Sequence, residues 1–142
     1  MRSLSPDSHE VSSVLNDLGE SASLSGDLVA AEMNYREALR VARIAGYAEG
    51  EAYITGNLAN TALQQEDWSN ANQLAQEALL LSEKIGRQEL IAAQCYHLAK
   101  AFLGQGKIGE ARPHAQRAVA IFTQLGSPEL DIAFKILEEC DI

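Results

Sequence analysis

Hydrophobic side chains recur at intervals of three and four residues over most of this chain. In the first part they are Val11, Val14, Leu15, Leu18 and Ala22, and after a break the spacing resumes with Leu28, Ala31, Tyr35, Ala38, Leu39 and Ala42. Such spacing places apolar side chains on one face of an α-helix. The pattern therefore predicts two amphipathic helices in the first 46 residues.

The same pattern returns with a constant step of 40 residues. Five columns of identical or similar residues share this step: Leu18, Leu58 and Leu98; Gly19, Ala59 and Ala99; Ala31, Ala71 and Ala111; Ala38, Ala78 and Ala118; and Gly46, Gly86 and Gly126. A fixed period of this kind is typical of stacked repeat proteins. We predict three helix pairs, with helices at about 8–24, 28–45, 48–65, 68–85, 88–104 and 108–125.

Short breaks separate the two helices of each unit. They are Gly26-Asp27, Glu66-Asp67 and Gly106-Lys107. An aspartate at this place can cap the second helix, because its carboxylate accepts hydrogen bonds from free N–H groups. The glycine column of residues 46, 86 and 126 stands where a left-handed residue would end that helix.

The two ends of the repeat carry similar start signals. Ser127-Pro128 predicts a seventh helix over about 128–140, with Ser as the cap and Pro in the first turn. Its apolar stripe would be Ile132, Ile136 and Leu137. Ser5-Pro6 has the same form before the first helix. Pro113 lies near the second turn of its helix, so we expect it to shift the start of that helix or to bend it slightly.

Small residues at fixed places have a structural meaning. Alanine at the same position in every unit allows neighbouring helices to approach closely, while the larger Leu, Tyr and Phe fill the spaces between them. A pair of helices cannot bury its apolar face alone. We therefore expect one all-α domain over residues 1–142, in which three pairs stack and the seventh helix covers the open end.

Composition and charge narrow the choice of partner. The formal net charge of −9 disfavours nucleic acid and anionic membrane surfaces, and a basic or neutral partner is easier to accommodate. The sequence has no apolar stretch of the length that spans a bilayer and no signal-peptide core near Met1, so we expect a cytoplasmic protein. Cys95 and Cys140 have no pairing pattern and are interpreted as packing residues.

On these columns the sequence resembles the tetratricopeptide repeat (TPR) family. The family pattern is Leu-Gly-x-x-Tyr, then Ala-x-x-x-Phe, then a further Ala. Its matches are Leu18-Gly19, Ala22, Ala31, Tyr35 and Ala38; Leu58-Ala59, Ala62, Ala71, Ala75 and Ala78; and Leu98-Ala99, Phe102, Ala111, Ala115 and Ala118. The resemblance implies a right-handed superhelical stack of three TPR hairpins, with repeats at about 8–46, 48–86 and 88–126 and a capping helix. The long period is similar to that of kinesin light chains and of bacterial multidomain signalling proteins.

In TPR proteins the first helices of successive repeats line a concave groove. The resemblance therefore implies a protein–protein interaction module that binds a peptide or protein segment there, in a bacterial multidomain or signalling system. The implied groove positions are Ser13, Asn16, Asp17 and Glu20; Tyr53, Gly56, Asn57, Asn60 and Gln64; and Ala93, Tyr96, His97 and Lys100. Among them the asparagines could pair with a peptide main chain, and the tyrosines would add stiff contact area. The alternative is a solvated groove with no dedicated ligand.

One TPR subclass can be tested on the sequence. Chaperone-binding TPRs hold a C-terminal carboxylate with a Lys and an Asn from the first repeat, an Asn from the second and two bases from the third. The matching residues here are Asn16, Glu20, Asn57, Tyr96 and Lys100. Only Asn57 and Lys100 fit, and Glu20 would repel a carboxylate. We therefore reject binding of chaperone tails.

No group of residues in the sequence indicates catalysis, a cofactor or a metal. His9, His97 and His114 are scattered without a second ligand at helical spacing, and we interpret them as surface or groove residues. Cys95 and His97 are two positions apart, which places them on different faces of a helix. We therefore expect a protein that is not an enzyme. The alternative function is a structural unit, a homodimer formed through the open repeat ends.

Overall fold

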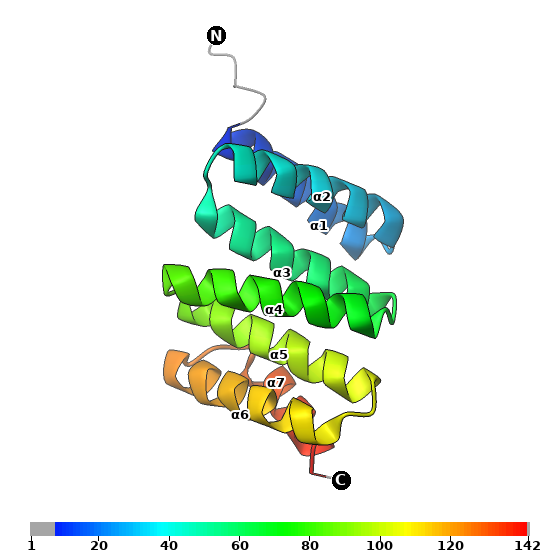
Figure 1. The fold of residues 1–142 in the computed structure, drawn as a ribbon, viewed down its shortest axis with the longest axis vertical. Helices are drawn as coiled ribbons and strands as arrows, with labels where there is room; N and C mark the ends of the chain where they lie inside the picture. Colours follow the sequence, from blue (N-terminus) through cyan, green and yellow to red (C-terminus); the bar gives the residue numbers. More distant parts are fainter. Residues whose placement is uncertain (1–7, 142) are drawn as a thin grey trace.

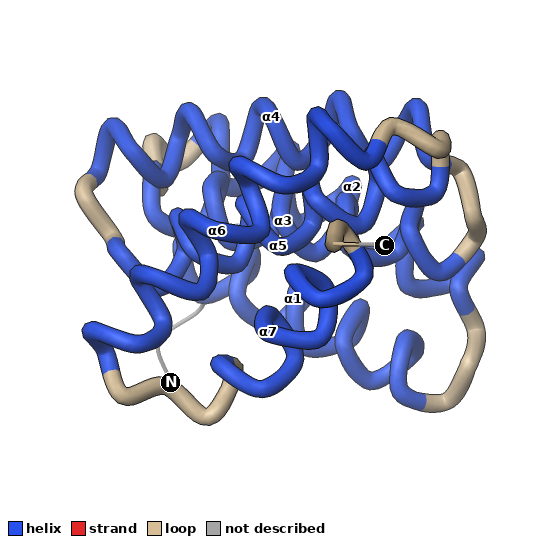
Figure 2. Tube along the Cα trace, turned by 90° about the horizontal axis from the view of Figure 1, so that it is seen from below, coloured by secondary structure: helices blue, strands red, loops and turns tan. Residues whose placement is uncertain are grey.

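The computed structural model describes residues 8–141, which form seven helices and no strand within that range. The helices are α1 (His9–Leu24), α2 (Leu28–Ile44), α3 (Ala48–Gln64), α4 (Trp68–Ile85), α5 (Gln88–Gly104), α6 (Ile108–Leu125) and α7 (Leu130–Glu139). Figure 1 shows them stacked in chain order, from α1 and α2 at one end to α6 and α7 at the other. Seen along the stack, α4 runs along one side of the molecule and α1 and α7 along the other (Figure 2). The predicted all-α stack of helix hairpins is confirmed.

Side chains at the breaks start the helices as the sequence predicts. Asp27 Oδ1 accepts a hydrogen bond from the Ala30 N–H at 3.0 Å, and Asp67 Oδ1 accepts one from the Asn70 N–H at 3.4 Å. Ser8 accepts from the Val11 N–H and so caps α1. The expected start signal at Ser5-Pro6 lies outside the described residues.

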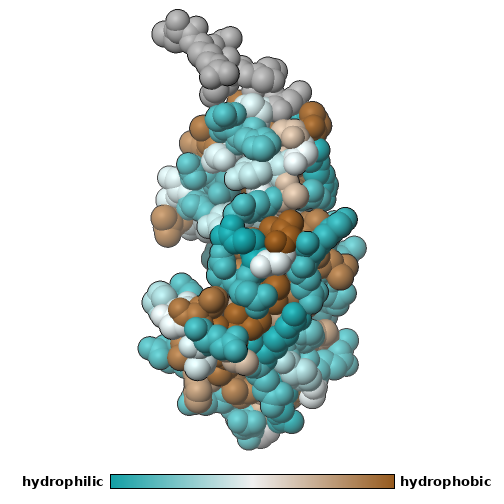
Figure 3. All heavy atoms as spheres, turned by 90° about the vertical axis from the view of Figure 1, so that its left-hand side faces the viewer, coloured by the Kyte–Doolittle hydropathy of each residue, from teal (hydrophilic) through white to brown (hydrophobic). Residues whose placement is uncertain are grey.

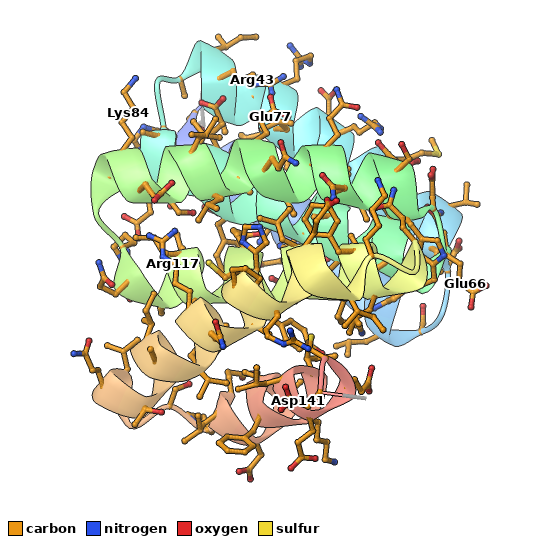
Figure 4. The ribbon with its side chains drawn as sticks, turned by 60° about the horizontal axis from the view of Figure 1, so that its bottom comes forward. Arg43, Glu66, Glu77, Lys84, Arg117 and Asp141 are labelled. Carbon is orange, nitrogen blue, oxygen red and sulfur yellow. The ribbon has the colours of Figure 1, made fainter. Side chains whose placement is uncertain are left out.

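The turns inside the hairpins require a left-handed residue at one place. The backbone there has φ of +86° at Gly26, +58° at Glu66 and +76° at Gly106, which are equivalent positions of the three units. Glycine adopts this conformation without steric cost, whereas a side chain makes it unfavourable. Glu66 is therefore a strained member of this set of positions, and its side chain extends into solvent from the turn between α3 and α4 (Figure 4).

The core is built from the repeated small residues and the large side chains between them. The six alanines of the two columns at 31, 71 and 111 and at 38, 78 and 118 are fully buried. Gly19 is needed where Tyr35 packs, because a Cβ at residue 19 would lie 2.5 Å from Tyr35 Cε1. Close packing of this kind fixes the positions of the groove-lining helices relative to one another.

The leucine column shows that the two ends of the stack differ. Leu58 and Leu98 are 2% and 1% exposed, because they pack against the second helix of the preceding unit. No helix within residues 8–141 packs on Leu18 in this way, so Leu18 is 51% exposed, and Val14, one turn earlier, is 54% exposed. The apolar stripe of α1 therefore remains partly open.

The other end of the stack is covered by α7. Ala133, Ile136 and Cys140 are buried against α5 and α6. The helix begins at Leu130 rather than at Pro128, because the Ser127 hydroxyl accepts a hydrogen bond from the Glu129 N–H at 3.1 Å and so closes a turn instead of capping the helix. The prediction that Ser127 caps this helix and that Pro128 lies in its first turn is therefore wrong.

Pro113 does not shift the start of its helix, contrary to one of the two expected effects. Helix α6 begins at Ile108, the position equivalent to Leu28 and Trp68 in the other units. The proline removes one N–H group from the helical ladder, and burial of Ala111 and Ala115 on the core side holds the helix in place.

Ion pairs connect the second helices on the outer surface. Arg43 Nη2 of α2 lies 3.6 Å from Glu77 Oε1 of α4, and the two side chains meet in Figure 4. Arg117 Nη2 of α6 donates to Glu83 Oε2 of α4 at 2.9 Å. Exposed pairs of this kind contribute at most about 1 kcal/mol each, so the stack depends mainly on its apolar core.

Candidate partner-binding groove

The first helices of the three units and α7 border a hollow on one side of the molecule. Figure 3 shows this hollow in the outline at the left, with hydrophobic side chains gathered on its lower, C-terminal side. Two clefts open here, one between α1 and α3 and one between α3, α5 and α7. Tyr53 lines both, so they are adjoining parts of one surface, which we call the groove.

The N-terminal cleft has a volume of about 310 Å³ and is lined mainly by polar side chains. Ser13, Asp17 and Tyr53 are exposed in it, as the resemblance implied. Glu20 lies partly buried at its wall and accepts a hydrogen bond from the Tyr53 hydroxyl at 3.2 Å. The pKa of Tyr53 is raised, first by its burial and then by the charges of Glu20 and Asp17.

Asn16 of this cleft binds a second implied contact residue, Asn57 of α3. Asn57 Nδ2 donates to Asn16 Oδ1 at 2.9 Å and approaches Glu20 Oε1 at 3.5 Å. Asn16 Nδ2 in turn lies 3.4 Å from the same carboxylate oxygen. Asn16 is buried, so it lies beneath the groove surface rather than on it. The amides of Asn16 and Asn57 thus connect α1 to α3 and orient Glu20.

The carboxylates of the groove differ in their partners. Arg87 forms ion pairs with both Glu49 and Glu89, which compensates part of their charge. The hydrogen bonds that Glu20 accepts in the described part of the chain come from neutral groups, namely Asn16, Tyr53 and Asn57. Among residues 8–141, Glu20 therefore presents a carboxylate that is held in position by neutral donors and forms no ion pair.

Gln94 of α5 is buried against Gly56 of α3, a residue that the resemblance places in the groove. A Cβ at residue 56 would lie 2.3 Å from Gln94 Nε2, so Gly56 is buried beneath this side chain. Gln94 Oε1 lies 2.9 Å from His97 Nδ1. Burial lowers the pKa of His97 to about 4, assisted by the positive charge of Lys100. His97 is therefore a neutral, partly buried residue.

The C-terminal cleft is larger and more apolar, with a volume of about 410 Å³. The implied groove residues Asn60, Ala93, Tyr96 and His97 line it together with Tyr53. Its other walls are Leu90, Phe122 and Ile132, with Glu89, Ser127 and Glu129 at its edge. This second group was not predicted from the sequence, because its members come from the first turn of α5, from α6 and α7, and from the turn between them.

The remaining implied residues lie away from these two clefts. Lys100 Nζ is 5.5 Å from the centre of the Tyr96 ring and lines a neighbouring cleft with Trp68 and Ile136. Gln64 is exposed at the last residue of α3. The structure therefore brings most of the implied positions together in the two clefts, and the four that line neither cleft are Gly56, Asn57, Gln64 and Lys100.

The other chemically active side chains serve packing. Cys95 and Cys140 are buried free thiols, and burial raises the pKa of Cys95 to about 11. His9 stacks on Tyr47 and His114 on Phe102, with ring centroids 4.3 and 5.7 Å apart. Residues 8–141 contain no cluster of His, Cys, Asp or Glu suited to a metal ion. Over the same range no helix is long and apolar enough to cross a membrane.

Comparisons with known proteins agree with this geometry. The family model for the tetratricopeptide repeat matches residues 52–85, which include α3 and α4. No curated protein matches the sequence. The solved structures that match include the apo form of RapI, which has 15% sequence identity and a TM-score of 0.87 over 93% of this chain. This chain spans about half of RapI, 48% of its length.

Two further solved structures match over nearly the whole chain. A TPR-like protein from Chlorobium tepidum has 18% identity and a TM-score of 0.79, covering 94% of this chain and 97% of that one. The N-terminal domain of stress-induced protein-1 from C. elegans has 19% identity and a TM-score of 0.72, with the same coverage of 94% and 97%. At these identities the likeness concerns the fold.

Proposed function

We propose that this chain, which matches the tetratricopeptide repeat over residues 52–85 and shares its fold with TPR-like proteins, works as a protein–protein interaction module whose groove binds an extended segment of a partner. The observation that carries this proposal is the groove itself, in which two clefts of about 310 and 410 Å³ adjoin at Tyr53. A segment lying along this surface could occupy both clefts at once. Contacts at several points are what specific binding of a flexible segment needs, because ordering the segment costs entropy.

We assign the contacts to residues with free polar or aromatic groups. Asn60 has no hydrogen-bond partner in the described part of the chain, so its amide can both donate to and accept from a main chain. Tyr53 and Tyr96 supply stiff aromatic area on either side of the C-terminal cleft. Asn57 contributes indirectly, because its amide binds Asn16.

A library of random twelve-residue peptides displayed on phage tests this proposal. Binders selected on the full chain should lose at least about ten-fold in affinity with Asn60→Ala and Tyr96→Ala. Gln73→Ala, on the exposed surface of α4, is the matched control and should leave binding unchanged. Binders that ignore both groove variants and respond to the control would place the interaction surface elsewhere.

We also propose a bacterial, cytoplasmic setting within a multidomain or signalling system, and no catalytic role. The support is the likeness in fold to the Chlorobium tepidum protein and the long repeat period of 40 residues. Genes or domains encoded beside this sequence would test it directly. A neighbouring sensor, ATPase or transcription-factor domain would agree with the proposal, whereas an isolated gene in a eukaryotic genome would contradict it.

A second candidate function is self-assembly, and one observation favours it. Val14 and Leu18 are about half exposed on α1, although the equivalent Ile54 and Leu58 are buried by the preceding helix. A second copy of the chain could cover this face. Binding in the groove would remain open in such a dimer, so the two functions are compatible.

A further inference from the structure

The two clefts of the groove differ in chemistry, and this difference limits what segment fits them. The N-terminal cleft holds Glu20 and Asp17, whereas the C-terminal cleft is walled by Leu90, Phe122 and Ile132. Tyr53 stands between them and lines both. A partner that follows the groove therefore meets an acidic end and an apolar end.

We propose that the partner segment carries a large apolar side chain that inserts between α3, α5 and α7, and a lysine or arginine that reaches toward α1 and pairs with Glu20. This inference rests on the proposed function and specifies the chemistry of the segment. The occupant is a short basic and hydrophobic stretch of another protein.

The apolar cleft supplies the main anchor. Its floor includes Leu90 and Phe122, which are buried by the surrounding helices and hold its shape. Ile132 is 46% exposed at its edge, so an incoming side chain would cover apolar area that water now contacts. Anchors of binding interfaces are typically large side chains in preformed pockets of this kind.

Glu20 supplies the charge that selects a cation. Asn16, Tyr53 and Asn57 direct neutral hydrogen-bond donors at this carboxylate, so it is oriented before any ligand arrives. An ion pair with a preoriented carboxylate costs less side-chain entropy than one between two free side chains. The pKa of the neighbouring Tyr53 is raised first by burial and then by the negative charges of Glu20 and Asp17.

The charges at the remaining edge of the groove also favour a basic segment. Glu129 borders the apolar cleft, and Arg87 is engaged by Glu49 and Glu89. An acidic segment would meet repulsion at both ends, in a protein whose formal net charge is −9. A neutral apolar segment would fill one cleft and offer no positive charge to Glu20.

Four pools of capped, fluorescein-labelled decapeptides test this inference. Each pool contains one fixed pair of residues at varied spacing, and Ala, Gly and Ser fill the other positions. The four pairs are Arg with Leu, Glu with Leu, Arg with Ser, and Glu with Ser. In fluorescence anisotropy on the full chain, the Arg and Leu pool should bind at least about ten-fold more tightly than the Glu and Leu pool or the Arg and Ser pool. Its affinity should also weaken as salt is added.

Two variants assign the preferences to the two clefts. Glu20→Gln keeps a hydrogen-bond acceptor for Tyr53 and should reduce the preference for Arg over Glu at least about five-fold, while the preference for Leu over Ser remains. Ile132→Ser should reduce the preference for Leu over Ser at least about five-fold, while the preference for Arg over Glu remains. Glu49→Gln is the control for Glu20, because Glu49 lines the same cleft but pairs with Arg87.

Amide spectra of the ¹⁵N-labelled chain distinguish failure of this inference from failure of the proposed function. Peptides that perturb residues of α3 and α5 in the groove but bind equally well with Arg or Glu would overturn the inference and leave groove binding intact. Perturbations confined to the outer surface of α2, α4 and α6 would overturn both. An absence of binding by all four pools, alongside groove binders from the random library, would overturn the inference alone.

Discussion

Asn57 on α3 donates a hydrogen bond to Asn16 on α1, with 2.9 Å between Nδ2 and Oδ1 and 41 residues of chain between them. Both residues occupy positions that the TPR resemblance assigns to partner contacts, and one of them is buried. The pair connects the first repeat to the second. It therefore has a structural role that any binding experiment with these residues must separate from a direct contact.

We predict that Asn57→Ala lowers the free energy of unfolding by about 1–2 kcal/mol, because it leaves the buried amide of Asn16 without its partner. Urea denaturation of the full chain measures the change. Asn60→Ala, one turn along the same helix, is the matched control and should stay within about 0.5 kcal/mol of wild type. Equal stability of both variants would show that the Asn16 and Asn57 pair contributes nothing.

Gly56 and Gly109 form a second matched pair, since both lie within helices and have ordinary helical backbones. Gly56→Ala should destabilise the protein by about 1–3 kcal/mol, because the new Cβ would lie 2.3 Å from the buried Gln94. Gly109→Ala meets no atom within 4 Å and should stabilise α6 by up to about 1 kcal/mol. Thermal unfolding followed by circular dichroism measures both, and changes of the same sign would contradict this account.

Glu66 offers a way to stabilise the protein. Its φ of +58° matches Gly26 and Gly106 at the equivalent turns, and its side chain is exposed. Glu66→Gly should therefore raise the free energy of unfolding by about 1 kcal/mol, because relief of the left-handed strain outweighs the greater freedom of glycine in the unfolded chain. Gln65→Gly is the control, since its φ of −82° is ordinary, and it should not stabilise the protein.

The helices could be predicted well from the sequence, and much of the site could not. The 40-residue step and the glycines that end the helices located the six repeat helices, and Ser127-Pro128 located the seventh, all within two residues of their observed bounds. The breaks inside the units contained the signal for Glu66, which stands where the other two units have glycine. A polar residue on a first helix looks alike in sequence whether it faces a ligand or another side chain, so the pairing of Asn16 with Asn57 was not predictable.

The apolar cleft could not be predicted from the sequence for a related reason. Phe122 and Ile132 come from α6 and α7, and they meet Leu90 of α5 only because α7 folds back on the third unit. The sequence predicted only that α7 covers the open end of the stack. Its exposed apolar side chains became part of a candidate site only once their neighbours in space were known.

The buried state of His97 gives a prediction for pH. Its pKa is about 4 in the folded protein, below the ordinary 6.5, so the unfolded chain binds a proton that the folded chain does not. Stability should therefore fall as pH decreases from about 6.5 to about 4, by a few kcal/mol at most. The pKa of His114 is also lowered by burial, so it adds a smaller change of the same sign.

Urea denaturation of the wild type and of His97→Gln at several pH values measures this effect. The variant should show a clearly flatter profile between pH 6.5 and 4.5, and the slope that remains should come from His114. Below that window the carboxylates with lowered pKa, such as Glu89, also lose stabilising interactions as they are protonated. An unchanged slope in His97→Gln would show that His97 remains accessible to protons in the folded protein.

The exposed face of α1 provides the test of self-assembly. Val14 and Leu18 are 54% and 51% exposed where the repeat pattern elsewhere places a covering helix. If a second copy covers them, light scattering at two concentrations should show the average mass rising toward that of a dimer. The double variant Val14→Gln and Leu18→Gln should then remain a monomer, because it removes apolar area from the contact without disturbing the core.

Leu80→Gln, which changes an exposed leucine on α4, is the control and should dimerise like the wild type. A constant monomer mass for the wild type would exclude self-assembly, and a dimer that survives the double variant would place the contact on another surface.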